Sequence, residues 1–160
     1  MPFARLEFPR DQNRADICKR TSEYGFFRFP RRSIRAERPL LAAATPSVDL
    51  PPASGPRHLV FDDAGRHAYL SLEMTGELVV FDYDDGRLQP VQTVAMDPGR
   101  RDGNAAAAVH LSSDGRFLYA SNRGEDNHIA VYAVDAASGQ LAAVQRRSTE
   151  GKGPREFALS

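Results

Sequence analysis

The sequence predicts an all-β protein, a β-propeller fragment of about two and a half four-stranded antiparallel blades that follow an irregular N-terminal leader. Two observations support this prediction. The segment His58–Ser71 recurs as Ala108–Ser121 at an offset of 50 residues, and Gly65-Arg66 falls on Gly115-Arg116. Each copy opens a series of short strands, and four such strands in roughly 45–50 residues are typical of a propeller blade.

A third copy begins near the end of the sequence. The tripeptide Gly55-Pro56-Arg57 recurs as Gly153-Pro154-Arg155, 98 residues or two periods later. Propellers typically need four or more blades to close a ring, so we expect this chain to be a truncated or partial copy. Closure removes exposed sheet edges, and the open blade edges of a fragment therefore favour self-association.

Residues 1–38 differ from the remaining 122 residues in charge and in pattern. They hold ten Arg/Lys and five Asp/Glu, a net charge of +5, whereas the rest holds 11 and 16, a net charge of −5. We expect residues 1–38 to be a disordered leader and residues 39–160 to form the partial propeller, because the leader has neither helical periodicity nor strict alternation. Its basic and aromatic stretch 25–32 could stack on nucleic acid bases, but we favour an unstructured leader without a nucleic-acid partner.

The composition excludes several classes of function. The 21 basic and 21 acidic residues cancel, which gives no global attraction to nucleic acids or membranes. Cys18 is the only cysteine, so an intrachain disulfide or a cysteine zinc cluster is impossible, and a reducing, cytoplasmic location is expected. No apolar run of 18 residues exists, and the N-terminus lacks the apolar core of a signal peptide, so neither a membrane span nor export is expected.

The first unit follows an extended connector rich in Pro, Ala and Ser at residues 42–56. Its strands are predicted at His58–Phe61, His67–Leu72, Glu77–Tyr83 and Leu88–Val94. Gly65 lies in the first turn, where glycine adopts a positive φ at little cost, and Gly76 lies in the second turn. Asp85-Gly86 is a hairpin signal before the fourth strand.

The second unit repeats this order. Its strands are predicted at Val109–Leu111, Phe117–Ser121, Ile129–Val134 and Leu141–Arg146. Gly115 and Gly139 mark the turns that match those of the first unit. The two units therefore predict two consecutive antiparallel blades.

The motifs within these repeats are more specific than their period. They are Gly55-Pro56-Arg57-His58-Leu59, the segment Ser112–Tyr119, Ser121-Asn122-Arg123-Gly124, and the segment Gly151–Ala158. Each motif is weak alone, but their order and spacing resemble the lactonase family of seven-bladed propellers. That family includes propeller-type 6-phosphogluconolactonases and a related fungal carboxymuconate-lactonising enzyme. The resemblance covers residues 39–160, roughly a third of such a domain.

This resemblance implies hydrolysis of 6-phosphogluconolactone to 6-phosphogluconate in the pentose phosphate pathway. It implies a small sugar lactone as the partner, and neither a metal nor an organic cofactor. Because the substrate is an anion, Arg side chains are expected to hold its phosphate and to stabilise the oxyanion formed during attack by water. A His or a carboxylate is expected to take the proton from that water.

Repeat equivalence locates the candidate site residues. The first strand of each blade lines the propeller channel, so His58, Ala108 and Glu156 are expected to face the same space. Glu73 and Arg123 follow the second strands at equivalent positions. The candidate catalytic residues are His58, Glu73 and Arg123, and the candidate substrate-binding residues are Arg57, Arg155 and Asn122. By resemblance, His58 lies in the family's Pro-Arg-His-Leu segment, Arg123 in its Ser-Asn-Arg-Gly segment, and Arg155 in its Pro-Arg-Asp/Asn-Phe segment.

Each candidate also has a structural interpretation. Arg57 and Arg155 could bridge neighbouring blades, and His58 could be a strand-end histidine with its polar atoms satisfied. Glu73 by itself would be a solvated loop acid. The other histidines, His67, His110 and His128, lack partners at metal-ligand spacing, so we expect surface or packing roles for them and no metal site.

Two positions depart from the family pattern. Ala108 stands where the family usually has a glutamate, and Leu72 stands where an asparagine is expected before Glu73. A side chain that ends at Cβ cannot accept a proton, so reduced activity is one expectation. The competing hypotheses are a lactonase-family hydrolase, a non-catalytic propeller segment that binds a phosphorylated sugar or a protein, and a gene fragment without independent function.

Overall fold

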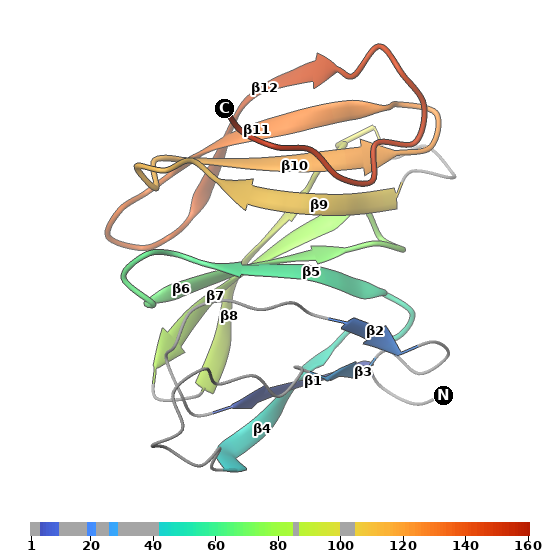
Figure 1. Ribbon diagram of the computed structural model, residues 1–160. Coiled ribbons are helices and arrows are strands. Elements are labelled where there is room, and N and C mark those ends of the chain that lie inside the picture. Colours follow the sequence, from blue (N-terminus) through green and yellow to red (C-terminus); the bar gives the residue numbers. More distant parts are fainter. Residues whose placement is uncertain (1–3, 10–18, 22–25, 29–41, 85–86, 100–104) are drawn as a thin grey trace.

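The computed structural model describes the chain apart from residues 1–3, 10–18, 22–25, 29–41, 85–86 and 100–104. Within the described residues the chain forms twelve strands in three four-stranded sheets, with no helix. Figure 1 shows the sheets stacked in chain order, with the N-terminal sheet at one end and the C-terminal sheet at the other. The prediction of an all-β, propeller-like fold with consecutive antiparallel blades is confirmed.

The N-terminal sheet has the strand order β2-β3-β1-β4. Its strands are β1 (Ala4–Pro9), β2 (Lys19–Thr21), β3 (Phe26–Arg28) and β4 (Ala42–Leu50). Three of these strands lie within residues 1–38, for which the sequence predicts an irregular leader, and β4 occupies most of the predicted connector. The pairing explains the difference, because β1 pairs in parallel with β3 and antiparallel with the distant β4, and non-local pairing leaves no turn signal. Cys18 and most of the basic and aromatic stretch lie outside the described residues.

The first blade is a four-stranded meander in which each strand pairs with the next. Its strands are β5 (Pro56–Phe61), β6 (His67–Leu72), β7 (Glu77–Asp84) and β8 (Arg87–Ala95). Gly65 has a φ of 66°, and the Asp62 carboxylate accepts a hydrogen bond from the Arg66 N–H at 2.7 Å, so the predicted turn forms as expected. The predicted hairpin turn at residues 85–86 lies outside the described residues.

The second blade repeats this meander with β9 (Ala105–Leu111), β10 (Phe117–Arg123), β11 (His128–Val134) and β12 (Leu141–Ser148). Gly115 has a φ of 70°, close to that of Gly65, so the repeat is kept in the backbone as well as in the sequence. The strand β9 begins four residues before the predicted start, because Ala105 and Ala106 also pair with the end of β10. Residues 149–160, the predicted start of a third unit, contain no strand.

The core between the blades comes from residues that alternate along neighbouring strands. Tyr69 and Val80 of the first blade pack in one cluster with Leu118 and Tyr132 of the second blade, and all four are almost fully buried. The opposite face of the first blade carries a separate cluster around Phe81 against β4. Each such large apolar side chain contributes about 1.5–3 kcal/mol on burial, so stacking holds the blades together.

Candidate functional site

The innermost strands of the two blades, β5 and β9, lie side by side. The Ser71 hydroxyl donates a hydrogen bond across the blade boundary to the Ala107 carbonyl at 2.9 Å. The Nδ1 atom of His58 accepts a hydrogen bond from the Val109 N–H at 3.1 Å. These contacts fix the register between blades, so equivalent positions of the two copies face the same space.

Each innermost strand is interrupted at the same repeat position. The pairing of β5 with β6 shifts between Pro56 and His58, and the pairing of β10 with β9 shifts between Ala120 and Asn122. Both irregularities are β-bulges, which re-aim side chains and are common beside functional sites.

A serine of the second strand fills the gap at each bulge. The Ser71 hydroxyl accepts the His58 N–H at 3.1 Å, and the Ser121 hydroxyl accepts the Ala108 N–H at 3.0 Å. The bulges therefore hold His58 and Ala108 in matching backbone positions.

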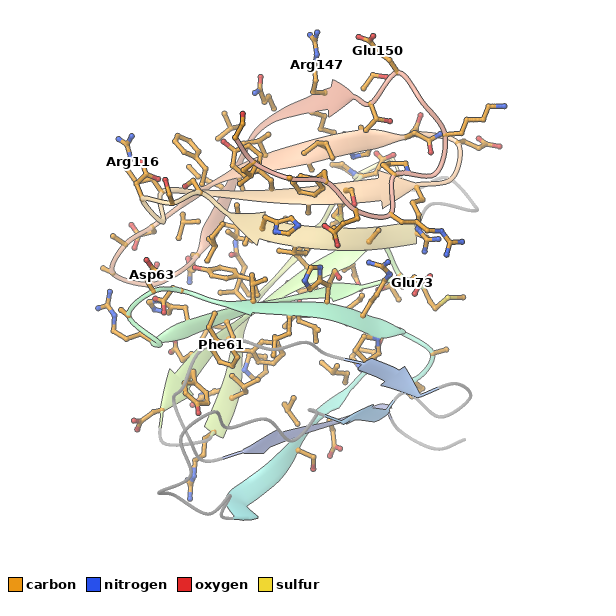
Figure 2. The ribbon with its side chains drawn as sticks, viewed as in Figure 1. Phe61, Asp63, Glu73, Arg116, Arg147 and Glu150 are labelled. Carbon is orange, nitrogen blue, oxygen red and sulfur yellow. The ribbon has the colours of Figure 1, made fainter. Side chains whose placement is uncertain are left out.

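A cluster of charged side chains lies where the two blades meet. Arg123, the last residue of β10, donates a hydrogen bond from Nη2 to Oε1 of Glu73, which follows β6. The Nε atom of Arg57 lies 3.7 Å from Oε2 of the same carboxylate. The Glu73 and Arg123 side chains are only 13% and 15% exposed. Figure 2 shows Glu73 between the ends of the two blades, so the structure brings together three of the predicted site residues.

The electrostatics of this cluster favour an anion. Burial lowers the pKa of Arg57, and the positive charges of Arg123 and Arg155 lower it further, whereas the Glu73 carboxylate raises it. A guanidinium stays charged in proteins, so the three positive charges of Arg57, Arg123 and Arg155 stand against the two carboxylates of Glu73 and Glu156. An incoming anion would relieve the repulsion among the arginines, and phosphate or carboxylate groups match the guanidinium geometry.

The remaining two predicted binding residues lie in different surroundings. Arg155 is exposed in the segment of residues 149–160, close enough for its charge to act on Arg57. Asn122 is 1% exposed, and neither its amide nitrogen nor its amide oxygen has a hydrogen-bond partner among the described residues. It faces Ala106 and His128 across the sheet, between the blades. Its role in binding stays a prediction.

A second group of side chains surrounds His58 and consists of Glu156, which the repeat predicts beside His58, together with His110 and Phe157, which the repeat does not predict there. The His110 ring contacts the His58 ring edge-on, with centroids 5.6 Å apart, and contacts the Phe157 ring at 4.7 Å. The Nε2 atom of His110 lies 2.6 Å from Oε1 of Glu156. One difference between the repeats could have indicated a special role for His110, because the equivalent residue of the first copy is the apolar Val60.

Two pKa shifts follow from this arrangement. Burial lowers the pKa of His58, and the neighbouring His110 and Arg57 lower it further against the opposing charge of Glu156. Partial burial acts to raise the pKa of Glu156, but hydrogen bonds from His110 and from the Phe157 N–H outweigh it and lower that pKa. The site thus favours a neutral His58 beside an ionised Glu156.

The two departures from the family pattern are well accommodated. Ala108 is fully buried on β9, and its methyl group brings no acid to the site. Leu72 is fully buried on the opposite side of the first blade, in the cluster that packs against β4. His67 and His128 are also buried: Nδ1 of His67 lies 2.9 Å from the Asp62 carboxylate, and Nδ1 of His128 lies 2.7 Å from the Asp126 carbonyl.

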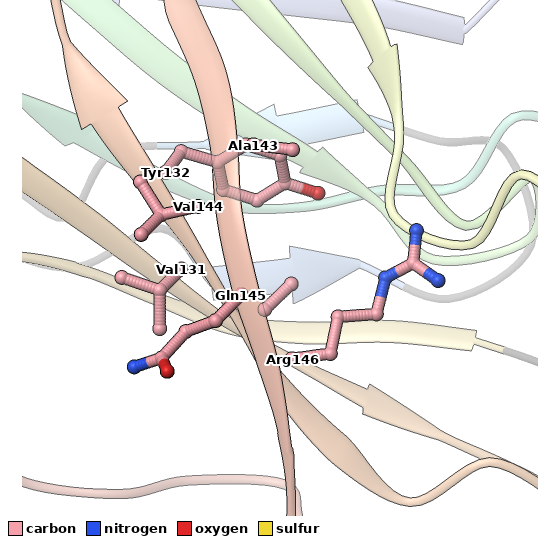
Figure 3. Close-up of a pocket in the computed structure, with 7 residues that line it drawn as sticks. Val131, Tyr132, Ala143, Val144, Gln145 and Arg146 are labelled. Atoms are coloured by element: carbon pink, nitrogen blue, oxygen red, sulfur yellow. The ribbon is translucent and has the colours of Figure 1, made fainter.

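The described part of the chain contains no group of three His, Cys, Asp or Glu side chains arranged to hold a metal ion. It also contains no helix of sufficient length and hydropathy to cross a membrane. A depression of about 340 Å³ lies over β11 and β12, near Tyr132 and Arg146 (Figure 3). Because β12 is the strand of its sheet farthest from β9, this depression is separate from the charged cluster.

Comparison with known proteins gives a consistent result. A family model described as lactonase, 7-bladed beta-propeller, matches residues 32–160. A 6-phosphogluconolactonase of Bacillus subtilis is 40% identical over 111 residues, which cover 68% of this chain and 32% of the relative. A 6-phosphogluconolactonase of Formosa agariphila is 32% identical over 114 residues, which cover 71% of this chain and 32% of the relative.

A solved structure supports the same relationship. The periplasmic gluconolactonase of Pseudomonas aeruginosa superposes with a TM-score of 0.73 and 54% identity, over 78% of this chain and 35% of that protein. The chain therefore spans about a third of the length of the relatives it matches.

Proposed function

Because the chain belongs to the lactonase family of seven-bladed β-propellers, we propose that it contributes to the hydrolysis of a sugar lactone, with 6-phosphogluconolactone as the first candidate substrate. The observation that carries this proposal is the half-buried cluster of Arg57, Glu73 and Arg123 beside His58. Such a cluster suits an anionic substrate whose carbonyl becomes an oxyanion during attack by water. The reaction belongs to the pentose phosphate pathway when the substrate carries the 6-phosphate.

The charged residues support a division of roles. Arg123 and Glu73 lie at the blade boundary, so Arg123 can hold an anionic group while Glu73 orients its guanidinium. The exposed Arg155 stands at the outside of the cluster, where it can meet the phosphate first. Bidentate guanidinium contacts give both attraction and geometric selection for phosphate.

The Pseudomonas structure favours a second substrate, since that protein is named a gluconolactonase. The unphosphorylated lactone offers the same ring and carbonyl but no dianion for the arginines. We expect the phosphorylated lactone to give the higher kcat/KM, because its phosphate gains charge-assisted hydrogen bonds that the other lactone lacks.

The experiment measures hydrolysis of both lactones by the full chain, as the rate of acid release above the spontaneous rate. A kcat/KM that is higher for 6-phosphogluconolactone supports the proposal. Equal kcat/KM values for the two lactones would contradict recognition of the phosphate by the arginines, and a higher value for the unphosphorylated lactone would make gluconolactone the substrate. No rate above the spontaneous one for either lactone would contradict hydrolysis by this chain.

A non-catalytic role is the second candidate function, and Ala108 is the observation that favours it. A propeller segment without the family's acid could still bind an anionic sugar through its arginines. Calorimetric binding of 6-phosphogluconate without any turnover of the lactone would support this alternative.

Self-association through the open side of the second blade is a further part of the proposal. Tyr119 and Val131 pair across β10 and β11 as Tyr69 and Val80 pair across β6 and β7. Tyr69 and Val80 are fully buried against the second blade, whereas Tyr119 stays half-buried. A second copy of this chain could cover that face, and sizing chromatography at several concentrations tests it.

The cytoplasmic location also stays a prediction, which cell fractionation tests, since the Pseudomonas relative is named periplasmic.

A further inference from the structure

We propose that His110 is the general base of this site, that Glu156 is the positioning residue that orients it, and that His58 donates a hydrogen bond to the substrate rather than acting as a base. The proposal rests on the lactone hydrolysis proposed above and assigns its proton transfers. It also gives a role to two residues outside the candidate catalytic and binding residues of the sequence analysis.

The backbone fixes the tautomer of His58. Its Nδ1 atom accepts the Val109 N–H at 3.1 Å, so the lone pair of Nδ1 is already used. In a neutral imidazole with an accepting Nδ1, the proton is on Nε2. A neutral His58 therefore has no free lone pair for a proton from water, but it has an Nε2–H that can bind a carbonyl oxygen or an oxyanion.

His110 has the opposite arrangement. Its Nε2 lies 2.6 Å from Oε1 of Glu156, and an ionised carboxylate can only accept, so Nε2 carries the proton. Nδ1 is then the basic atom of a neutral ring, and no described residue contributes a hydrogen bond to it. The side chain is 34% exposed, so water and substrate can reach it. A carboxylate that holds a histidine in one tautomer is the arrangement that activates such bases in other enzymes.

Glu156 supplies the carboxylate that β9 lacks. Residues 58, 108 and 156 are equivalent in the repeat, and Ala108 leaves the middle position without an acid. Oε1 of Glu156 contacts Nε2 of His110, and the Phe157 ring packs edge-on against the same imidazole, with centroids 4.7 Å apart. The charged and titratable groups around His110 are Glu156, His58 and, acting on both of them, Arg57.

His110 carries the transferred proton through both halves of the reaction. Nδ1 of His110 takes a proton from water while the water oxygen forms a bond to the lactone carbonyl carbon. The resulting oxyanion accepts a hydrogen bond from the Nε2–H of His58, with the nearby arginine charges adding stabilisation. The carbon–oxygen bond of the ring then breaks, and the leaving ring oxygen takes the proton back from His110. The product is a hydroxy acid, which ionises at neutral pH and releases one proton to solvent.

The test compares variants of the full chain at Glu156 and His110 with a matched control. We expect kcat/KM to fall by about 100-fold or more in His110→Gln, as for other general bases. Glu156→Ala should lose more activity than Glu156→Gln, because glutamine still offers an accepting oxygen to Nε2. Removal of the carboxylate should also release the single tautomer of His110, which a purely structural role would not do.

Glu150→Gln is the matched control, since it removes one carboxylate from an exposed position six residues before Glu156. Figure 2 shows Glu150 at the outer end of the second blade, away from Glu73. Its kcat/KM and pH profile should equal those of the unsubstituted chain. Thermal unfolding of every variant separates lost activity from lost folding.

Nitrogen NMR of isotope-labelled histidines gives a second readout, independent of activity. The expected result is an Nε2–H tautomer for both His58 and His110, and loss of the single tautomer at His110 in Glu156→Ala. If the chain hydrolyses lactones while folded His110→Gln and Glu156→Ala match the control, this inference is overturned and the proposed function stands. If neither the unsubstituted chain nor any variant hydrolyses a lactone, the proposed function and this inference are both overturned. The NMR tautomers then show only whether the hydrogen bonds of His58 and His110 form in solution.

Discussion

The two blades use one backbone to carry different chemistry. On β5 and β9 the bulged strands hold His58 and Ala108 in matching positions, and each donates its N–H to a serine hydroxyl at 3.1 and 3.0 Å. One position carries an imidazole and the other carries only a methyl group. After the second strands, the equivalent residues Glu73 and Arg123 have opposite charges and contact each other. The repeat therefore preserves the backbone scaffold, whereas the site arises from side chains that differ between the two copies.

The blades also differ in how completely their faces are covered. The first blade is packed on both sides, against β4 and against the second blade, and every residue of β6 is buried. The second blade is packed on one side, and seven of the eight residues of β12 are exposed. Substitution at equivalent repeat positions should therefore change the free energy of unfolding by different amounts in the two blades.

The largest expected difference concerns the equivalent tyrosines. Tyr69→Ala should lower the free energy of unfolding by about 3–5 kcal/mol, because it opens a large cavity between the blades. Tyr119→Ala should cost clearly less, since Tyr119 is half-buried. Urea unfolding followed by circular dichroism measures both. Equal losses would mean that the second blade is as well covered as the first.

Tyr69→Phe is the matched control for this pair. The Tyr69 hydroxyl has no hydrogen-bond partner among the described residues, and burial raises the pKa of Tyr69 to about 12. Removing that hydroxyl should leave the stability unchanged or slightly higher. A large loss in Tyr69→Phe would show that the hydroxyl has a partner.

The equivalent serines should differ by less. Ser71 accepts the His58 N–H and donates to the Ala107 carbonyl of the next blade, so Ser71→Ala leaves two groups without a partner and should cost about 1–3 kcal/mol. Among the described residues Ser121 has only the bond from the Ala108 N–H, so Ser121→Ala should cost about 1 kcal/mol. Denaturant midpoints of the two variants, taken with equal slopes, check the order. A larger loss of stability in Ser121→Ala than in Ser71→Ala would contradict a stabilising role for the bond from Ser71 to the next blade.

Substitution of the equivalent turn glycines should lower the stability of the two blades by equal amounts. Gly65 and Gly115 have φ of 66° and 70°, and a Cβ at either position would meet nothing within 4 Å. Each Gly→Ala change should therefore cost about 1–2 kcal/mol from the left-handed backbone alone. Thermal unfolding should show two equal losses, and unequal losses would show that the two turns differ in their packing.

The smallest expected effect is a pH dependence of the unfolding free energy that arises from His58 in the first blade. The folded protein lowers the pKa of His58, so neutral His58 contributes stability that is complete above its usual pKa of about 6.5 and is lost as the pH falls through the lower folded value. Protonation also breaks the bond from Val109. The unfolding free energy should fall more between pH 7.5 and pH 5 in the unsubstituted chain than in His58→Asn. Parallel pH curves would contradict this contribution of His58.

Local signals in the sequence predict the blades well. The turns at Gly65 and Gly115 depend on residues within five positions of each other, and they form as predicted. The contact between Glu73 and Arg123 also follows from the repeat, since equivalent positions of stacked blades meet. The strands β1 to β3 could not be predicted. They lack alternation, β1 pairs with the distant β3 and β4, and β2 and β3 have only 3 residues each.

The same limit explains what was missed in the site. The partner of His110 is Glu156, 46 residues later in a segment without strand structure, so no spacing rule connects them. The hydrogen bond from the Val109 N–H to Nδ1 of His58 could not be predicted from the sequence either, since it depends on the distance between two strands.

If the charged cluster at the blade boundary binds the lactone, the positive charge of Arg123 is needed for hydrolysis. The kcat/KM for 6-phosphogluconolactone should be measured for the full chain, for Arg123→Gln, and for Arg147→Gln, whose arginine is exposed on β12 far from Glu73 (Figure 2). Loss of a charge-assisted contact should lower kcat/KM by about 10-fold or more in Arg123→Gln, and Arg147→Gln should match the unsubstituted chain. Equal activity of all three would contradict the assignment of the site to this cluster.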